Sequence, residues 1–251
     1  MKKIMFRINH YLFSDFEFSG KELSCVIDTG ANKTLIPKWH NIKREVIGPG
    51  PRIKYALGGI DGFSDRILVS SIKSNDFKVN NIEILEKKVD IPKHVKGKNG
   101  KITFSGIDNF DILPIIGTDI FKGKVININD DKKTIFVAND INEFNDTDKK
   151  NTINIINNEG YIVVIGYINN KKCKILVDTG VVNGGVIIGT KSGITVSGSN
   201  LSLQICNKKM DFEKNKVIKS IDADYCIVGY EIFRRCRFGI IDFKNKKMLI
   251  Q

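Results

Sequence analysis

The stretch KELSCVIDTG at residues 21–30 has a partial copy in KKCKILVDTG at residues 171–180. Both stretches begin with polar residues, continue into a short apolar run and end in Asp-Thr-Gly. A single Asp-Thr-Gly carries little information, because Asp and Gly are common turn residues. Two copies in matched surroundings indicate an internal repeat, and a repeat decides the architecture before any local pattern does.

A second pair of similar segments supports the repeat. IIGTDIF at 115–121 matches IVGYEIF at 227–233, and each is followed by an apolar run, a polar turn and a last apolar run. The polar segment 139–151, rich in Asp, Asn and Lys, separates the two copies. The sequence therefore predicts an N-terminal lobe over residues 1–138, a linker over 139–151 and a C-terminal lobe over 152–251.

The apolar runs are short and predict strands. Most span four to seven residues, are rich in Ile, Val and Phe, and are separated by Gly, Asn, Asp and Lys. This pattern is typical of strands joined by hairpins, and helical periodicity over eleven residues or more is missing. We expect an all-β protein, with strands over residues 23–27, 67–71, 125–129, 161–168, 175–177 and 238–243.

The composition is that of a globular protein. A chain of 251 residues with 41% hydrophobic content can bury one large core or two lobes. The charged start MKKIMFR lacks the apolar run of a signal peptide, and no stretch reaches the roughly 18 apolar residues of a membrane span. We expect a cytoplasmic protein without membrane contact. Two strand-like runs nearly fill the first 27 residues, so we expect no separate prosegment.

Charge and cysteine content bear on partners and cofactors. A net charge of +12 would suit a nucleic-acid partner if the basic residues were clustered. The lysines are instead scattered, commonly beside Asn, which is typical of solvated turns and argues against nucleic acid. The 5 cysteines form no Cys-x-x-Cys pair and the 3 histidines lack the spacing of metal ligands. We therefore predict no metal and no cofactor.

The two Asp-Thr-Gly stretches and the apolar-apolar-Gly segments resemble the retropepsin and pepsin family of aspartic peptidases. The resemblance implies a bilobal acid-protease-like β-barrel fold, in which two related lobes enclose a central cleft and contribute the catalytic residues Asp28 and Asp178. Further residues would form the supporting loops and the segments packed beneath them, namely Thr29, Gly30, Ala31, Thr179 and Gly180 in the loops and Ile116, Gly117, Val228 and Gly229 beneath.

Two aspartates suit the chemistry that the resemblance implies. Peptide hydrolysis can use two carboxyl groups that hold one water, with one ionised to accept a proton and the other protonated to donate one. Two close carboxyls cannot both ionise at low cost, so such a pair carries a single negative charge over a wide pH range. The implied activity is that of an endopeptidase in which water is activated between Asp28 and Asp178, acting on an extended polypeptide.

The glycine-rich segment GGIDGF resembles the flap tip of retroviral proteases and is expected to cover the substrate; it comprises Gly58, Gly59, Ile60, Asp61, Gly62 and Phe63. Residues 193–198 offer no convincing counterpart, so we expect one flap only. Both aspartates lie on one chain, which predicts that the active unit is a monomer.

Two alternatives remain open. Val181 stands where the family usually has Ala, Ser or Thr, and Gly184 lies in a less regular loop than its counterpart, so the protein could be a catalytically degenerate peptide-binding member of the same fold. Actin-like phosphotransferases also carry two Asp-x-Gly loops, but their fold needs long amphipathic helices and phosphate-binding glycine loops near the first strand. Neither feature is visible in the sequence.

Overall fold

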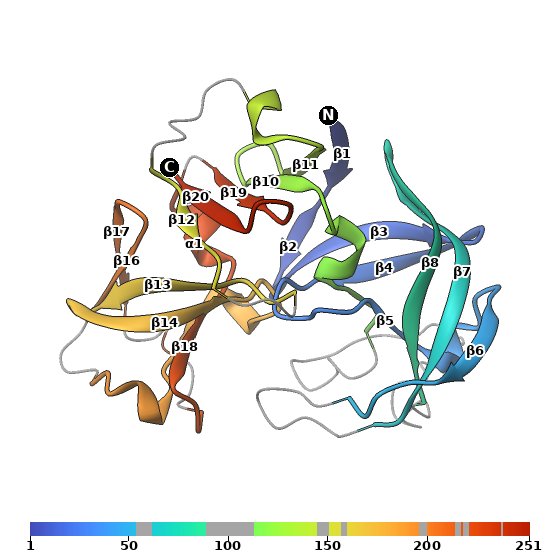
Figure 1. Cartoon of the computed structure of the whole chain (residues 1–251), viewed down its shortest axis with the longest axis horizontal. Coiled ribbons are helices and arrows are strands. Elements are labelled where there is room, and N and C mark those ends of the chain that lie inside the picture. Colours follow the sequence, from blue (N-terminus) through green and yellow to red (C-terminus); the bar gives the residue numbers. More distant parts are fainter. Residues whose placement is uncertain are drawn as a thin grey trace.

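The structure is a computed structural model of the whole chain (Figure 1). It describes residues 1–53, 62–88, 113–144, 151–156, 160–195, 200–213, 217, 221–236 and 238–251. Over these segments the chain is mostly β-structure in curled sheets, which confirms the all-β prediction. Their helices are 3₁₀ turns of three or four residues and the α-helix α1 (Glu231–Arg234), and none has the length or apolar content needed to cross a bilayer.

The first half of the chain, residues 1–144, forms an eight-stranded sheet. Period-2 alternation explains its strands: in β3, Leu12, Phe16 and Phe18 are buried on one face and Asp15 is exposed on the other. The strand order is β2 (Arg7–Asn9), β3 (Tyr11–Phe18), β4 (Lys21–Ile27), β9 (Ile115–Ile116), β5 (Leu35–Pro37), β8 (Phe77–Lys87), β7 (Ser64–Ser74) and β6 (Glu45–Pro49), with β3 also pairing with β7.

The second half, residues 151–251, forms a six-stranded sheet at the left of Figure 1. Its strand β14 has the same succession of exposed and buried residues as β4, so the two repeated stretches fold alike. The strand order is β15 (Val186–Ile187), β18 (Tyr225–Val228), β14 (Lys171–Val177), β13 (Val163–Ile168), β16 (Asn200–Ile205) and β17 (Lys208–Glu213).

The internal repeat of the sequence is also a repeat of strand pairing. In the first half β4 runs parallel to β9, so that Ile27 lies beside Ile116. In the second half β14 runs parallel to β18, so that Val177 lies beside Val228. A short strand then pairs antiparallel with each of these partners, β5 with β9 and β15 with β18. The repeated segments therefore occupy equivalent places in the two halves.

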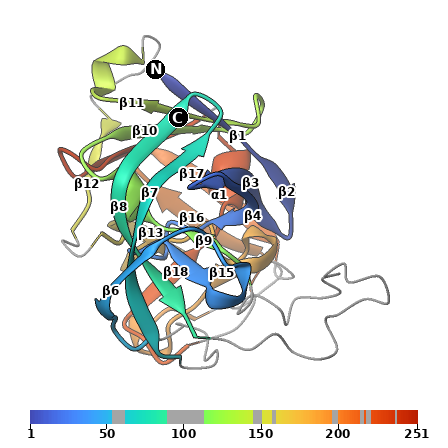
Figure 2. The same cartoon turned by 90° about the vertical axis from the view of Figure 1, so that its right-hand side faces the viewer.

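A third sheet joins the halves. Three of its strands come from the first half and three from the second, and they meet where β10 and β19 pair antiparallel, from Val125 opposite Asp242 to Ile128 opposite Gly239. Figure 2 shows β10 and β11 beside β1, with both chain ends close to this sheet. The strand order is β1 (Lys2–Met5), β11 (Thr134–Ala138), β10 (Val125–Asn129), β19 (Gly239–Asp242), β20 (Lys247–Ile250) and β12 (Ile153–Asn154).

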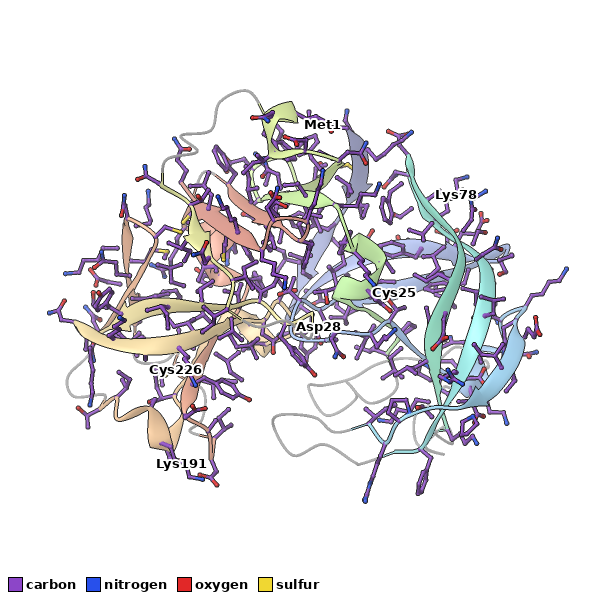
Figure 3. All side chains as sticks on the ribbon, in the orientation of Figure 1. Met1, Cys25, Asp28, Lys78, Lys191 and Cys226 are labelled. Atoms are coloured by element: carbon purple, nitrogen blue, oxygen red, sulfur yellow. The ribbon has the colours of Figure 1, made fainter. Side chains whose placement is uncertain are left out.

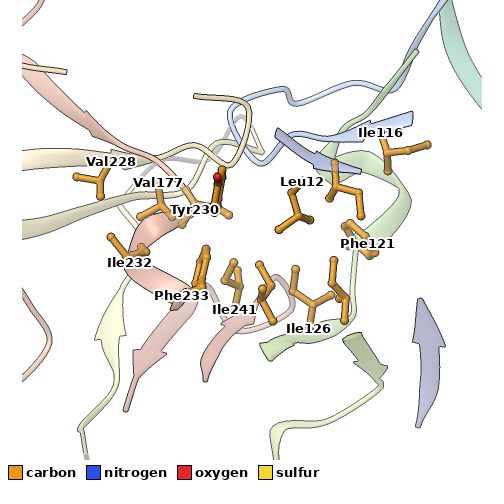
Figure 4. Close-up of a cluster of buried hydrophobic side chains, with 14 of the residues drawn as sticks. Leu12, Ile116, Phe121, Ile126, Val177, Val228, Tyr230, Ile232, Phe233 and Ile241 are labelled. Atoms are coloured by element: carbon orange, nitrogen blue, oxygen red, sulfur yellow. The ribbon is translucent and has the colours of Figure 1, made fainter. Parts of the chain in front are cut away.

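One continuous apolar core contacts all three sheets. Figure 4 shows Leu12 and Ile116 of the first sheet on one side, Val177 of the second on the other, and Ile126 and Ile241 of the joining sheet below them. All five side chains are essentially removed from solvent. Full burial of a side chain of this size stabilises the fold by about 1.5–3 kcal/mol. The loops that follow β4 and β14 thus rest on a packed base.

Candidate active site

Asp28 and Asp178 lie at equivalent positions, directly after β4 and β14. The N–H of Asp28 donates to the carbonyl oxygen of Ile116, and the N–H of Asp178 donates to that of Val228, each over 2.9 Å. Ile116 and Val228, which we expected beneath the site, are fully buried. Figure 3 shows Asp28 in the middle of the molecule, where the two halves meet.

The carboxyl groups of Asp28 and Asp178 are hydrogen-bonded to each other. Each also accepts a 2.8 Å hydrogen bond at Oδ1 from a glycine of its own loop, Gly30 to Asp28 and Gly180 to Asp178. A methyl group on Gly30 would lie 2.2 Å from Cγ of Asp178, and one on Gly180 would lie 2.5 Å from Cγ of Asp28. Only glycine leaves room for the opposite carboxyl at these two positions.

The environment of this pair favours protonation. Burial raises the pKa of Asp28, and hydrogen bonds from Asp178 and from the loop backbone partly offset that rise. Burial raises the pKa of Asp178 well above its ordinary value, and the charge of Asp28 raises it further. Because a charge on one carboxyl opposes ionisation of the other, the pair loses its two protons in separate steps and carries one negative charge between them.

Thr29 and Thr179 interlock the two loops. The hydroxyl of Thr29 donates to the carbonyl oxygen of Val177 over 2.8 Å and accepts from the N–H of Thr179 over 3.0 Å. The hydroxyl of Thr179 donates to the carbonyl oxygen of Ile27 over 2.7 Å and accepts from the N–H of Thr29 over 3.0 Å. Both side chains are buried, so these four bonds hold the loops together without competition from water.

Gly117 and Gly229 let the neighbouring backbone approach closely. A methyl group on Gly117 would lie 2.4 Å from the backbone of Lys33. One on Gly229 would lie 2.5 Å from the backbone of Gly184. Any side chain at either position would push the loop that follows the aspartate out of place.

The two loops are supported differently, which the sequence analysis does not predict. In the first half, the carboxylate of Asp119 accepts from the N–H of Thr34 over 2.9 Å and from its hydroxyl over 2.7 Å, and that hydroxyl accepts from the N–H of Gly117 over 3.1 Å. Burial raises the pKa of Asp119, and the bonds from Thr34 partly offset that rise. In the second half Glu231 takes the matching position but pairs with Arg234 at 3.1 Å. The sequence offers one signal for this support, because the two similar segments 115–121 and 227–233 carry an acidic residue at the same position, Asp119 in the first and Glu231 in the second.

Val181, the residue that raised doubt about the second loop, fits its place. Val181 and Ala31 make the same backbone bond, in which their N–H groups donate to the carbonyl oxygens of Asp178 and Asp28 over 3.2 Å. The branched side chain of Val181 is only 2% exposed, in an apolar cluster with Leu176, Ile187 and Ile227. It therefore packs away from solvent in the second half and keeps the backbone bond that Ala31 makes in the first.

Only the base of the predicted flap belongs to the described structure. Gly58, Gly59, Ile60 and Asp61 lie outside the described residues. Ile53 and Gly62 pair antiparallel through two backbone hydrogen bonds of 2.8 and 3.3 Å, as the base of a hairpin would. Phe63 is 72% exposed, so its side chain makes little contact with the rest of the described chain.

The described residues offer an acid–base site. Among them, no group of three or more His, Cys, Asp or Glu side chains is arranged to hold a metal ion. Two carboxyl groups in contact, with raised pKa values, can accept a proton from a bound molecule and donate a proton to it. No protein-family model matches the chain, and no curated protein resembles it closely enough to count as a match.

Proposed function

We propose that the protein is an aspartic endopeptidase with a bilobal acid-protease-like β-barrel fold, in which Asp28 and Asp178 form the catalytic pair. The observation that carries the proposal is the contact between their carboxyl groups, each on an equivalent loop of one half. Glycines that leave room for the carboxyls and threonines that lock the loops support the same arrangement. Such a pair meets the requirement of peptide hydrolysis for one proton acceptor and one proton donor.

We assign the proton-donating role to Asp178, the carboxyl whose pKa is raised both by burial and by the charge of Asp28. Ionised Asp28 takes a proton from water while the water oxygen attacks the peptide carbonyl carbon, and protonated Asp178 donates to the carbonyl oxygen. The resulting gem-diol collapses when Asp28 passes its proton to the amide nitrogen and Asp178 recovers one from a hydroxyl. The C–N bond then breaks, which releases a carboxylic acid and an amine and restores the starting protonation state.

The substrate that suits this site is an extended polypeptide lying between the two halves. The pairing of Ile53 with Gly62 supports the predicted flap, which would add backbone hydrogen bonds to such a strand. We further propose that one chain suffices for activity, because both aspartate loops belong to it. Activity per milligram would then not depend on enzyme concentration.

The two alternative functions have less support. A degenerate binding protein would need only one well-formed loop, yet the bonds at Asp28 and Asp178 match in donor, acceptor and length. An actin-like phosphotransferase would need long helices, and within the described segments no helix exceeds four residues. An actin-like fold also does not account for the two threonines that bond across the halves.

The test is cleavage of a peptide library by the purified full chain, followed by mass spectrometry. We expect cleavage by the parent protein, inhibition by a statine-type mimic of the gem-diol, and loss of turnover in Asp28→Asn and Asp178→Asn. Asp224→Asn is the matched control, because Asp224 is exposed and pairs only with Lys174 at the surface of the second half. It should cleave at the parental rate.

The outcomes separate the candidates. Binding of the statine-type mimic without any cleavage would favour the degenerate binding protein. Thermal stabilisation by a nucleotide would favour the phosphotransferase, because a ligand that binds only the native state raises Tm. Near-parental activity in Asp178→Asn would refute the catalytic pair.

A further inference from the structure

His10 of the first half contacts the aspartate loop of the second half. The carbonyl oxygen of His10 accepts from the N–H of Asn183 over 2.7 Å. The imidazole Nδ1 of His10 lies 2.9 Å from Oδ1 of Asn183, which is a hydrogen bond when Nδ1 carries the proton. Asn183 is five residues after Asp178, in the loop that carries the second Asp-Thr-Gly. One residue of the first half therefore makes two bonds to this loop.

Both partners have a backbone conformation that suits their contact. His10 is the tip of the β2–β3 hairpin, and Arg7 of that hairpin pairs with Asp15 at 2.9 Å and also bonds to Ser24 of β4. His10 and Asn183 have φ values of 59° and 55°, the left-handed conformation in which Asn is several-fold enriched and His is tolerated. The hairpin thus presents the exposed His10 to the exposed Asn183.

Within the described residues, the loop that carries Asn183 has no carboxylate support like that in the first half, and its backbone is held by the N–H of Gly229, which donates to the carbonyl oxygen of Gly185 over 2.8 Å. In the first half, Thr34 and the carboxylate of Asp119 fasten the first aspartate loop from within. In the second half the equivalent acid, Glu231, is paired with arginines instead. The bonds from His10 come from outside the second half and reach the loop at the position that Thr34 and its neighbours occupy in the first.

We propose that His10 is a positioning residue for the catalytic site, which holds the second aspartate loop through Asn183 and thereby keeps the carboxyl of Asp178 in contact with that of Asp28. The inference rests on the proposed peptidase function for its kinetic consequence only. In structural terms, the β2–β3 hairpin supports the second aspartate loop through Asn183, as Asp119 supports the first through Thr34.

The test uses glycine variants of the full chain, because glycine keeps the left-handed backbone while removing the side-chain bond. His10→Gly, Asn183→Gly and the double variant are compared with Asn170→Gly, a control at an exposed asparagine with φ 62° in the β13–β14 turn. Three readouts are needed: kcat and KM on one cleavable peptide, Tm, and hydrogen exchange of residues 178–185 without substrate.

We expect each single variant to lower kcat about threefold to tenfold, the effect of one hydrogen bond, with KM unchanged. The double variant should lose no more than either single one, since both remove the same bond. Exchange of residues 178–185 should quicken in all three, whereas Asn170→Gly should match the parent. Additive losses of kcat, or a KM increase with kcat unchanged, would overturn the proposal.

The exchange measurement keeps the inference separate from the proposed function. If the parent protein cleaves no peptide, the peptidase proposal fails, and faster exchange in His10→Gly and Asn183→Gly still supports the positioning contact. If the parent cleaves peptides and exchange of residues 178–185 is the same in all variants, the positioning role of His10 is refuted while the peptidase proposal stands.

Discussion

Thr29→Val tests whether the threonine interlock holds the two halves together. Valine has nearly the same shape as threonine but lacks the hydroxyl. The change removes the bond to the carbonyl oxygen of Val177 and the bond from the N–H of Thr179. Thr29 is 1% exposed, so no water can take the place of the lost hydroxyl.

The size of the effect follows from these two groups. A buried polar group left without a partner costs about 1–3 kcal/mol, so two such groups should lower the free energy of unfolding by roughly 2–6 kcal/mol. At about 2–4 °C per kcal/mol for a chain of this size, Tm should fall by roughly 4–24 °C. Thr179→Val should cause a similar loss, because its hydroxyl makes the same two kinds of bond over 2.7 and 3.0 Å.

Calorimetry and urea unfolding measure the loss directly. Thr29→Ser is the control, since serine keeps the hydroxyl and removes only a methyl group, at a cost of about 1 kcal/mol. The reasoning is refuted if Thr29→Val is no less stable than Thr29→Ser. It is also refuted if Thr29→Val and Thr179→Val differ by several kcal/mol, because the bonds that they remove are equivalent.

Three further predictions concern the site. Burial and the charge of Asp28 raise the pKa of Asp178, so the parent should lose stability as the pH climbs above 3.8 and through the folded pKa. Tm of Asp178→Asn minus that of the parent should therefore grow over this window and be constant below it. Gly180→Ala brings a methyl group 2.5 Å from Cγ of Asp28 and should lower kcat at least about tenfold, whereas Gly20→Ala, with nothing within 4 Å, should leave kcat unchanged despite a strained φ of +94°. Asp119→Ala leaves the buried N–H of its partner threonine unpaired and should cost about 2–4 kcal/mol in urea unfolding, while Asp119→Asn keeps an acceptor and should cost less.

Each of these three predictions can fail on its own. A pH-independent difference in Tm between Asp178→Asn and the parent would show that the carboxyl is not destabilised by charge. Parental kcat in Gly180→Ala would mean that the opposite carboxyl has room to move. Equal losses in Asp119→Ala and Asp119→Asn would show that the negative charge, and not the acceptor alone, is what the loop requires.

The sequence predicts the strands well because their pattern is local. The runs expected at 125–129 and 238–243 correspond to β10 and β19, and the run at 23–27 lies within β4. Alternation of buried and exposed side chains, interrupted by Gly, Asn and Lys, is enough to recognise them. The matched apolar runs before the two Asp-Thr-Gly tripeptides likewise fold as equivalent strands.

Contacts between distant residues leave no such pattern. The bonds of Thr34 to Asp119 and of His10 to Asn183 join residues that are 85 and 173 positions apart, and none of these residues is unusual in its local sequence. The alternation of buried and exposed residues identifies β10 and β19 as strands. It does not say which of the many similar strands each one pairs with. The catalytic roles, the flap, the monomeric state and the cytoplasmic location stay predictions.

The joining sheet has a consequence for any attempt to divide the chain. Cutting between β11 and β12 and separating the pieces would turn β10 and β19 into edge strands, each with a row of unsatisfied N–H and C=O groups beside apolar side chains. An isolated first half would therefore tend to self-associate, with β10 of one copy lying antiparallel to β10 of another in place of β19. The symmetric dimer made this way would carry two copies of Asp28 and no Asp178.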